Sequence, residues 1–279
     1  MLINLNNVRL SYADHEVLGG ISLRISRGEK ICIIGPSGCG KTSLLNVISG
    51  VQKPTSGMAF NNYDRLSYVF QEDRLLPWKT VRENIRIVNP GAEDMEIRNI
   101  IRLVGLEGFE NHLPSELSGG MRQRTSIARG FFFPAGLLLM DEPLKSLDYC
   151  LRMNLVENIL QLTGETDRTL LYVTHEIDEA LMLADRILVL TRCPAIVSEE
   201  LQIHTPQTLR DLSDHEMTVN RNRIIRLLKG YHEPPYFQSA RQPIPEKGFK
   251  HTTVPAPSVR SGYTPHRHHS AHRRSASPS

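Results

Sequence analysis

Residues 35–42 read GPSGCGKT, and this segment constrains the fold more than any other part of the sequence. It follows a compact apolar run at 30–34 and precedes a helical pattern that closes at Gly50. Glycines let backbone N–H groups curl around an anion, and the N-terminus of the following helix adds partial positive charge. The pattern G-x-x-x-x-G-K-[ST] between a strand and a helix therefore predicts a phosphate-binding loop.

The chemistry of this loop assigns a role to each residue type. Lys41 is expected to reach the β- and γ-phosphates of a nucleotide, and Thr42 to supply a hydroxyl ligand to Mg²⁺, with Ser43 directly behind. The predicted nucleotide-binding residues of the loop are Gly35, Pro36, Ser37, Gly38, Cys39, Gly40, Lys41, Thr42 and Ser43.

Two neighbouring acidic residues follow a second apolar run further along the chain. Residues 137–140 (LLLM) are typical of a buried strand, and Asp141 and Glu142 come directly after them. In-line phosphoryl transfer needs charge neutralisation and a positioned water more than it needs covalent chemistry. We therefore expect Asp141 to enter the Mg²⁺ shell and Glu142 to orient the attacking water.

A third segment, LSGGMRQR at 117–124, resembles the signature sequence of ABC ATPases and lies just upstream of the acidic strand, as in that family. Ser118, Gly119 and Gly120 at a helix start form a second anion cradle. One chain does not need two cradles for one nucleotide. The resemblance implies that the signature of one copy closes on the γ-phosphate held by a second copy, so a head-to-tail homodimer with ATP at its interface is expected.

Weaker elements fall in the order of the same family. The resemblance implies that Tyr12 stacks on adenine, that Gln71 contacts Mg²⁺ and water, and that His175 hydrogen-bonds the γ-phosphate as a switch residue. Residues 146–148 match the loop that crosses the dimer interface. Together the motifs predict ATP and Mg²⁺ as cofactors, the catalytic residues Glu142, His175, Gln71 and Lys41, and the metal ligands Thr42, Gln71 and Asp141.

Residues 71–78 and 80–84 look particularly like ATPase subunits of nitrate, sulfonate, taurine or bicarbonate importers, and Met121 points the same way. The resemblance implies an ATP-hydrolysing subunit at the cytoplasmic face of the cell membrane. It would act with transmembrane permease subunits and, indirectly, with an extracytoplasmic solute-binding protein. Importers of thiamine precursors look similar. A soluble ABC ATPase that works on ribosomes or DNA is the alternative from another class, and a non-hydrolysing regulator is a further one.

Apolar runs that alternate with helical patterns predict an α/β fold with a parallel sheet and crossover helices. We expect a P-loop NTPase core of the ABC ATPase type at 24–80 and 133–205, a small antiparallel β subdomain near the start, and a helical subdomain at about 82–132. Residues 1–230 are expected to form the nucleotide-binding domain. The predicted strands lie within 1–27 and at 30–34, 67–70, 135–140, 169–173 and 186–190, and the predicted helices at 42–50, 81–112, 147–162, 176–184 and 216–229.

Net charge and the lengths of the apolar stretches limit the kinds of binding partner that the sequence predicts. The formal net charge is +3, and residues 1–230 show no basic stripe, so we expect no nucleic-acid partner. Proline interrupts the most apolar stretch, 131–140, and a bilayer span needs about 20 apolar residues, so we expect membrane association through a partner only. Residues 231–279 are rich in proline, histidine and arginine with few aliphatic clusters, which predicts a disordered basic tail.

Three departures from the family pattern stand out. Lys145 replaces a small residue before the interface loop, and its effect on dimer closure is left open. Residues 129–133 (RGFFF) are unusual where the helix generally continues with alanine and leucine, and the short segment 58–64 predicts a trimmed antiparallel sheet. None of the three removes a predicted catalytic residue, so activity is expected.

Overall fold

The computed structural model describes residues 1–145 and 147–232, so Ser146 and the expected tail from residue 233 onward lie outside the described residues. The elements run in the order β1 (Ile3–Tyr12), β2 (His15–Ile25), β3 (Lys30–Ile34), α1 (Lys41–Ile48), β4 (Ser56–Asn61), β5 (Leu66–Val69), α2 (Val81–Arg86), α3 (Asp94–Leu103), η1 (Pro114–Glu116), α4 (Gly119–Phe132), β6 (Leu137–Asp141), α5 (Tyr149–Glu165), β7 (Thr169–Val173), α6 (Ile177–Leu183), β8 (Arg186–Leu190), β9 (Val197–Gln202), η2 (Gln207–Leu209) and α7 (His215–His232).

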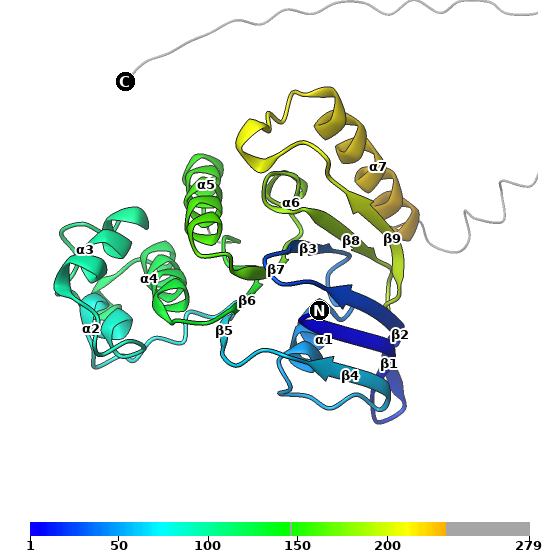
Figure 1. Cartoon of the computed structure of the whole chain (residues 1–279), viewed down its shortest axis with the longest axis horizontal. Coiled ribbons are helices and arrows are strands. Elements are labelled where there is room, and N and C mark those ends of the chain that lie inside the picture. Colours follow the sequence, from blue (N-terminus) through cyan, green and yellow to red (C-terminus); the bar gives the residue numbers. More distant parts are fainter. Residues whose placement is uncertain (146, 233–279) are drawn as a thin grey trace, which may run out of the picture. The chain divides into compact units, whose positions relative to one another are not determined.

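A six-stranded sheet in the order β5-β6-β7-β3-β8-β9 forms the centre of the fold (Figure 1). All neighbouring strands pair in parallel except β8 and β9, which are antiparallel. Every residue of β6 and β7 is buried, because helices or a second sheet cover both faces of a parallel sheet. This explains why these strands appear in the sequence as continuous apolar runs.

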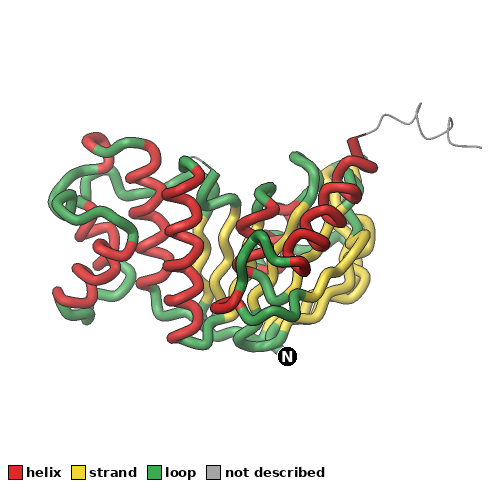
Figure 2. Tube along the Cα trace, turned by 90° about the horizontal axis from the view of Figure 1, so that it is seen from above, coloured by secondary structure: helices red, strands yellow, loops and turns green. Residues whose placement is uncertain are grey.

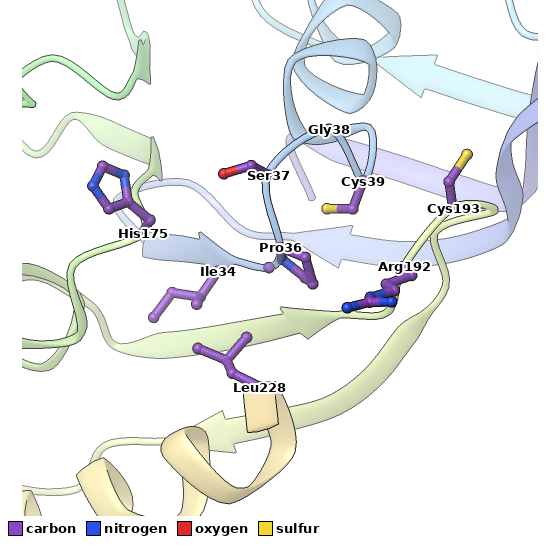
Figure 3. Close-up of a pocket in the computed structure, with 10 residues that line it drawn as sticks. Ile34, Pro36, Ser37, Gly38, Cys39, His175, Arg192, Cys193 and Leu228 are labelled. Carbon is purple, nitrogen blue, oxygen red and sulfur yellow. The ribbon is translucent and has the colours of Figure 1, made fainter. Parts of the chain in front are cut away.

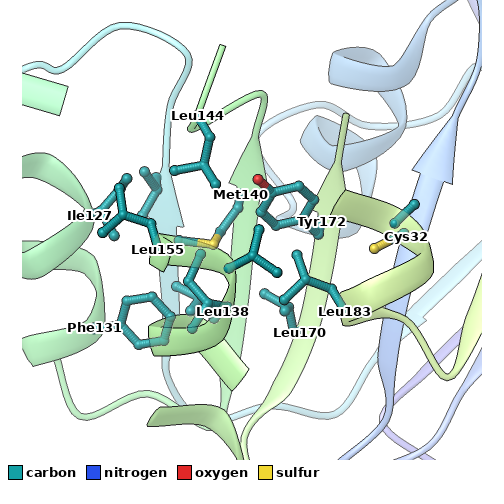
Figure 4. Close-up of a cluster of buried hydrophobic side chains, with 14 of the residues drawn as sticks. Cys32, Ile127, Phe131, Leu138, Met140, Leu144, Leu155, Leu170, Tyr172 and Leu183 are labelled. Atoms are coloured by element: carbon teal, nitrogen blue, oxygen red, sulfur yellow. The ribbon is translucent and has the colours of Figure 1, made fainter. Parts of the chain in front are cut away.

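The period of two along each strand divides the interior into two clusters. Leu138, Met140 and Tyr172 point to one face, where they meet Phe131 of α4 and Leu155 of α5 (Figure 4). Leu137, Leu139 and Leu171 belong to a second cluster, which also contains residues of α1, β1 and β2. The parallel sheet is therefore the shared wall between the two clusters.

The three-stranded sheet β2-β1-β4 is antiparallel and forms the small subdomain expected near the start. Its strand β4 spans Ser56–Asn61, so most of the short segment 58–64 pairs with β1. Met58 and Phe60 are exposed, whereas the apolar residues of β1 and β2 are buried against the second cluster.

The region that the sequence predicted as one helical stretch at 81–112 contains two helices, α2 and α3. Pro90 lies between them, where it cannot continue a helix. A capping box at each start, with Thr80 before α2 and Glu93 before α3, satisfies first-turn N–H groups. Together with α4, these helices gather at one side of the strands (Figures 1 and 2).

A close approach explains the unusual sequence at 129–133. A Cβ added to Gly130 of α4 would lie 2.4 Å from Val69 Cγ2 of β5. Ser67 Oγ on the same strand donates to the Gly130 carbonyl oxygen at 2.7 Å. Only glycine allows this contact, and the neighbouring Phe131 then fills the interior beside it.

Among the residues that the structure describes, no helix is long and apolar enough to cross a membrane.

Candidate functional site

Three neighbouring strands bring the predicted site residues to one edge of the sheet. The order β6-β7-β3 places the carboxyl ends of these strands side by side, and Asp141 pairs with Val173 while Ile33 also pairs with Val173. The phosphate-binding loop follows β3, Glu142 follows β6 and His175 follows β7. In open α/β sheets ligands bind outside the carboxyl ends of the strands, and this edge is such a place.

The loop at 35–40 has the conformation that its glycines were expected to allow. Gly40 precedes α1 with φ 111°, and a side chain there would meet Val17 Cγ1 at 2.8 Å. The Lys41 ammonium group donates to the carbonyl oxygens of Gly35 and Pro36, at 2.9 and 3.0 Å. The lysine side chain therefore lies buried along the loop, beside the N-terminus of α1.

Thr42 and Asp141 bring together two oxygen atoms of the kind that bind Mg²⁺. Thr42 Oγ1 donates to Asp141 Oδ2 at 2.7 Å. Burial raises the pKa of Asp141, and the Thr42 hydrogen bond acts in the opposite direction. Mg²⁺ is bound in proteins by one or two such oxygens together with substrate phosphates and water. This pair, next to a phosphate-binding loop, fits a Mg²⁺ that accompanies a nucleotide.

Glu142 lies among the side chains of two lysines and one histidine. Lys145 Nζ is 2.8 Å from its Oε2, His175 Nδ1 is 3.5 Å from the same oxygen, and Lys41 Nζ is 4.0 Å from Oε1. Burial alone would raise the pKa of Glu142, but the close Lys145 ammonium group and the other neighbouring basic groups outweigh it and hold the pKa below its ordinary value. Glu142 is thus a carboxylate at the edge of the sheet.

The backbone of Glu142 is also strained. Its φ is 45°, in the left-handed region that a glutamate rarely adopts. Such strain persists where the surrounding structure fixes it, and it concentrates at functional sites. The strained backbone aims the carboxylate at the phosphate-binding loop.

Two pockets border the phosphate-binding loop. One of about 390 Å³ contains Lys41, Thr42, Gln71 and Glu142 in its lining, and Lys145 joins them. The other, of about 520 Å³, shares Ser37, Gly38 and Cys193 with the first and is shown in Figure 3. The second pocket is lined by Ile34, Gly35, Pro36, Ser37, Gly38, Cys39, His175, Arg192, Cys193 and Leu228.

The sequence did not single out His15, Arg192 and Cys193, which belong to these linings. Cys193 reaches the site because its Sγ donates to the Glu16 carbonyl oxygen at 3.1 Å, which holds the loop after β8 against the β1–β2 hairpin. No motif marks these positions, since only the packing of hairpin against loop brings them to the nucleotide site.

Other predicted residues do not reach either pocket. Tyr12 is exposed at the end of β1, in register with His15. Ser118 caps α4 by accepting from the Met121 N–H at 3.3 Å, with Gly119 and Gly120 in the first turn. Neither lining contains any of these four, so within one chain Ser118, Gly119 and Gly120 form a cradle separate from the phosphate-binding loop.

Comparison with known proteins supplies the family. The family model for ABC transporters matches residues 18–145. The chain is 42% identical over 206 residues to an aliphatic sulfonates import ATP-binding protein of Pseudomonas syringae pv. tomato, covering 73% of this chain and 89% of that protein. It is likewise 42% identical over 206 residues to a nitrate import ATP-binding protein of Synechocystis, covering 68% of this chain but 31% of that protein.

Solved structures agree with the sequence relatives. A dimeric bacterial ABC transporter cassette matches with a TM-score of 0.66 at 29% identity, and it covers 74% of this chain and 100% of the other. A dimeric ATP-binding cassette in a post-hydrolysis state, bound to ADP and Pi, matches with a TM-score of 0.65 at 28% identity over the same shares. These likenesses confirm the predicted α/β fold of a P-loop ATPase. The chain therefore belongs to the family of ATP-binding proteins of ABC transporters.

Proposed function

We propose that this protein is the ATP-hydrolysing subunit of an ABC importer, and that it energises the uptake of a small solute of the sulfonate or nitrate type. The observation that carries the proposal is the meeting of Lys41, the Thr42–Asp141 pair, Glu142 and His175 at one edge of the sheet. The relatives named as sulfonate and nitrate import proteins support the direction of transport and the class of solute.

The geometry supports a division of labour in hydrolysis. The loop N–H groups and Lys41 bind the β- and γ-phosphates, and Glu142 accepts a hydrogen bond from the attacking water. The water oxygen forms a bond to the γ-phosphorus while the bond to the β–γ bridging oxygen breaks. ADP leaves with those electrons, and the proton lost by the water passes to a γ-phosphate oxygen of the released phosphate. His175 donates to the γ-phosphate from the adjacent strand end. Thr42, Asp141 and Gln71 would hold Mg²⁺, which would supply positive charge to neutralise the phosphates.

The separate cradle at the start of α4 supports a shared site. Ser118, Gly119 and Gly120 lie outside both pockets of their own chain, and they are free to close on the γ-phosphate bound by a second copy. Two copies arranged head to tail would bind two nucleotides, with Tyr12 against adenine. The dimeric state of the related cassettes supports this arrangement.

The coupling partner is proposed to be a membrane permease. Trp78 is 71% exposed, beside the exposed Gln71 segment and at the start of the helical region. An exposed aromatic seven positions after a residue that lines the nucleotide pocket suits the docking of a cytoplasmic permease helix, so that dimer closure drives alternating access. We propose residues 1–230 as the nucleotide-binding domain that acts at the cytoplasmic face, with a solute-binding protein across the membrane.

The decisive experiment uses Glu142→Gln. This variant should bind ATP as the wild type does but lose phosphate release, because the amide no longer polarises water. Purified from native membranes with ATP, the variant should carry a multi-span permease that mass spectrometry identifies. Full turnover in the variant would refute the assigned role, and ribosomal or DNA-repair partners without a membrane protein would refute the importer.

A further inference from the structure

Lys145 makes a contact that none of the three sequence motifs requires. It follows Glu142 in a tight turn, in which the Lys145 N–H donates to the Glu142 carbonyl oxygen at 3.4 Å. The turn folds the lysine side chain back, so that Nζ lies 2.8 Å from Glu142 Oε2. Lys145 is 48% exposed and Glu142 is 11% exposed, and both line the pocket that contains Lys41 and Thr42.

This contact competes with the function proposed for Glu142. A carboxylate polarises water as an acceptor, and an ammonium group 2.8 Å from one of its oxygens stabilises the negative charge there and weakens that oxygen as an acceptor for water. Lys145 lies closer to Oε2 than does His175, at 2.8 Å compared with 3.5 Å. Lys41 lies beyond hydrogen-bond distance, at 4.0 Å from Oε1. Lys145 is therefore the cation that engages Glu142 most closely.

We propose that Lys145 is a positioning residue that restrains hydrolysis by holding Glu142 through Oε2. The proposal rests on the hydrolytic function proposed above. The pair must open before Oε2 accepts a hydrogen bond from the attacking water, and the opening lowers the rate of each turnover. Lys145 is thus not a phosphate ligand, although it borders the same pocket, and its removal acts on kcat rather than on nucleotide affinity.

The test compares steady-state phosphate release by the full chain with saturating Mg²⁺ and varied ATP. Lys145→Met should raise kcat about two- to fivefold, as expected when an ion pair at this exposure no longer has to open, and should change KM less than about twofold. Lys145→Arg keeps the charge and should retain a kcat close to that of the wild type. Lys79→Met, which removes the exposed 3.8 Å pair with Glu83, is the matched control and should leave both constants unchanged.

A double variant shows whether Lys145 acts through Glu142. Lys145→Met should give no gain when Glu142 is already Gln, because the group that it restrains is gone. An equal gain in the double variant, an unchanged or lower kcat in Lys145→Met, or a raised KM with constant kcat would each overturn the proposal. Equal turnover of the wild type and Glu142→Gln would instead overturn the hydrolytic function itself, and with it this inference.

Discussion

Replacing Arg152 with methionine tests how two segments of the site are held together. Arg152 of α5 is 13% exposed, and its Nη2 donates to the Leu147 carbonyl oxygen of the preceding loop at 2.9 Å. Its Nη1 lies 2.5 Å from Glu176 Oε1, directly after His175, and its Nε lies 3.5 Å from Glu179 Oε1. One side chain therefore joins the loop before α5 to the segment that follows β7.

The cost of the substitution can be worked from these contacts. A hydrogen bond from a charged donor contributes about 1.5–3 kcal/mol, and removing one partner of a buried ion pair costs about 3–5 kcal/mol. Glu179 is 2% exposed but keeps two hydrogen bonds, from Tyr172 and Thr174 at 2.8 and 2.7 Å, which places its share at the lower end. Methionine retains the packing of the arginine stem. We expect the free energy of unfolding to fall by about 3 kcal/mol.

The assay is urea-induced unfolding followed by circular dichroism, with Arg102→Met as the control. Arg102 also pairs with a glutamate, Glu107, at 2.9 Å, but both side chains are exposed, so its loss should cost less than about 1 kcal/mol. Adding Glu179→Gln to Arg152→Met should recover about 1–2 kcal/mol, because a neutral amide tolerates the loss of the cation. A loss in Arg152→Met no larger than in the control would refute the reasoning.

Three further predictions follow from single contacts. The N–H groups of His204 and Thr205 donate to Glu216, outweigh its burial and hold the pKa of Glu216 below its ordinary value. The stabilisation that Glu216 contributes is therefore present above about pH 4.3 and is lost as the pH falls through the folded-state pKa. The difference in the free energy of unfolding between wild type and Glu216→Gln, measured by denaturation, should be largest near neutrality and vanish in acid. Gly130→Ala should destabilise the protein by about 1–3 kcal/mol, because the added methyl group clashes with Val69. Gly164→Ala, in a helix with open space around the added methyl group, should stabilise the protein by about 0.5–1 kcal/mol in the same assay. Stability changes of the same sign in both variants would contradict the packing argument. Thr42→Val should raise the Mg²⁺ concentration for half-maximal phosphate release about tenfold, and an unchanged Mg²⁺ requirement would exclude the hydroxyl as a ligand.

Much of the fold could be predicted because its strongest signals are local. The strands at 30–34, 169–173 and 186–190 are present with the predicted bounds, since a strand buried on both faces is apolar at nearly every position after its first. Strand β9 was not singled out, because its exposed positions are polar and its pairing with β8 depends on residues far away in the sequence. The division of 81–112 into two helices depends on Pro90, which outweighs the apolar periodicity around it.

The features of the candidate site also fall into those that the sequence predicts and those that only the folded structure shows. The sequence alone predicted the phosphate-binding loop and the acidic pair after β6, because each is a short motif whose chemistry requires those residues at that spacing, and the resemblance to the family implied the histidine after β7. Only the tertiary structure decided that Lys145 turns back onto Glu142, that Arg152 joins two loops, and that Cys193 borders the nucleotide pocket. The reason is physical: a motif specifies a local backbone, whereas the direction of the Lys145 side chain within its turn, and the packing of Arg152 and Cys193 against distant segments, depend on the folded chain.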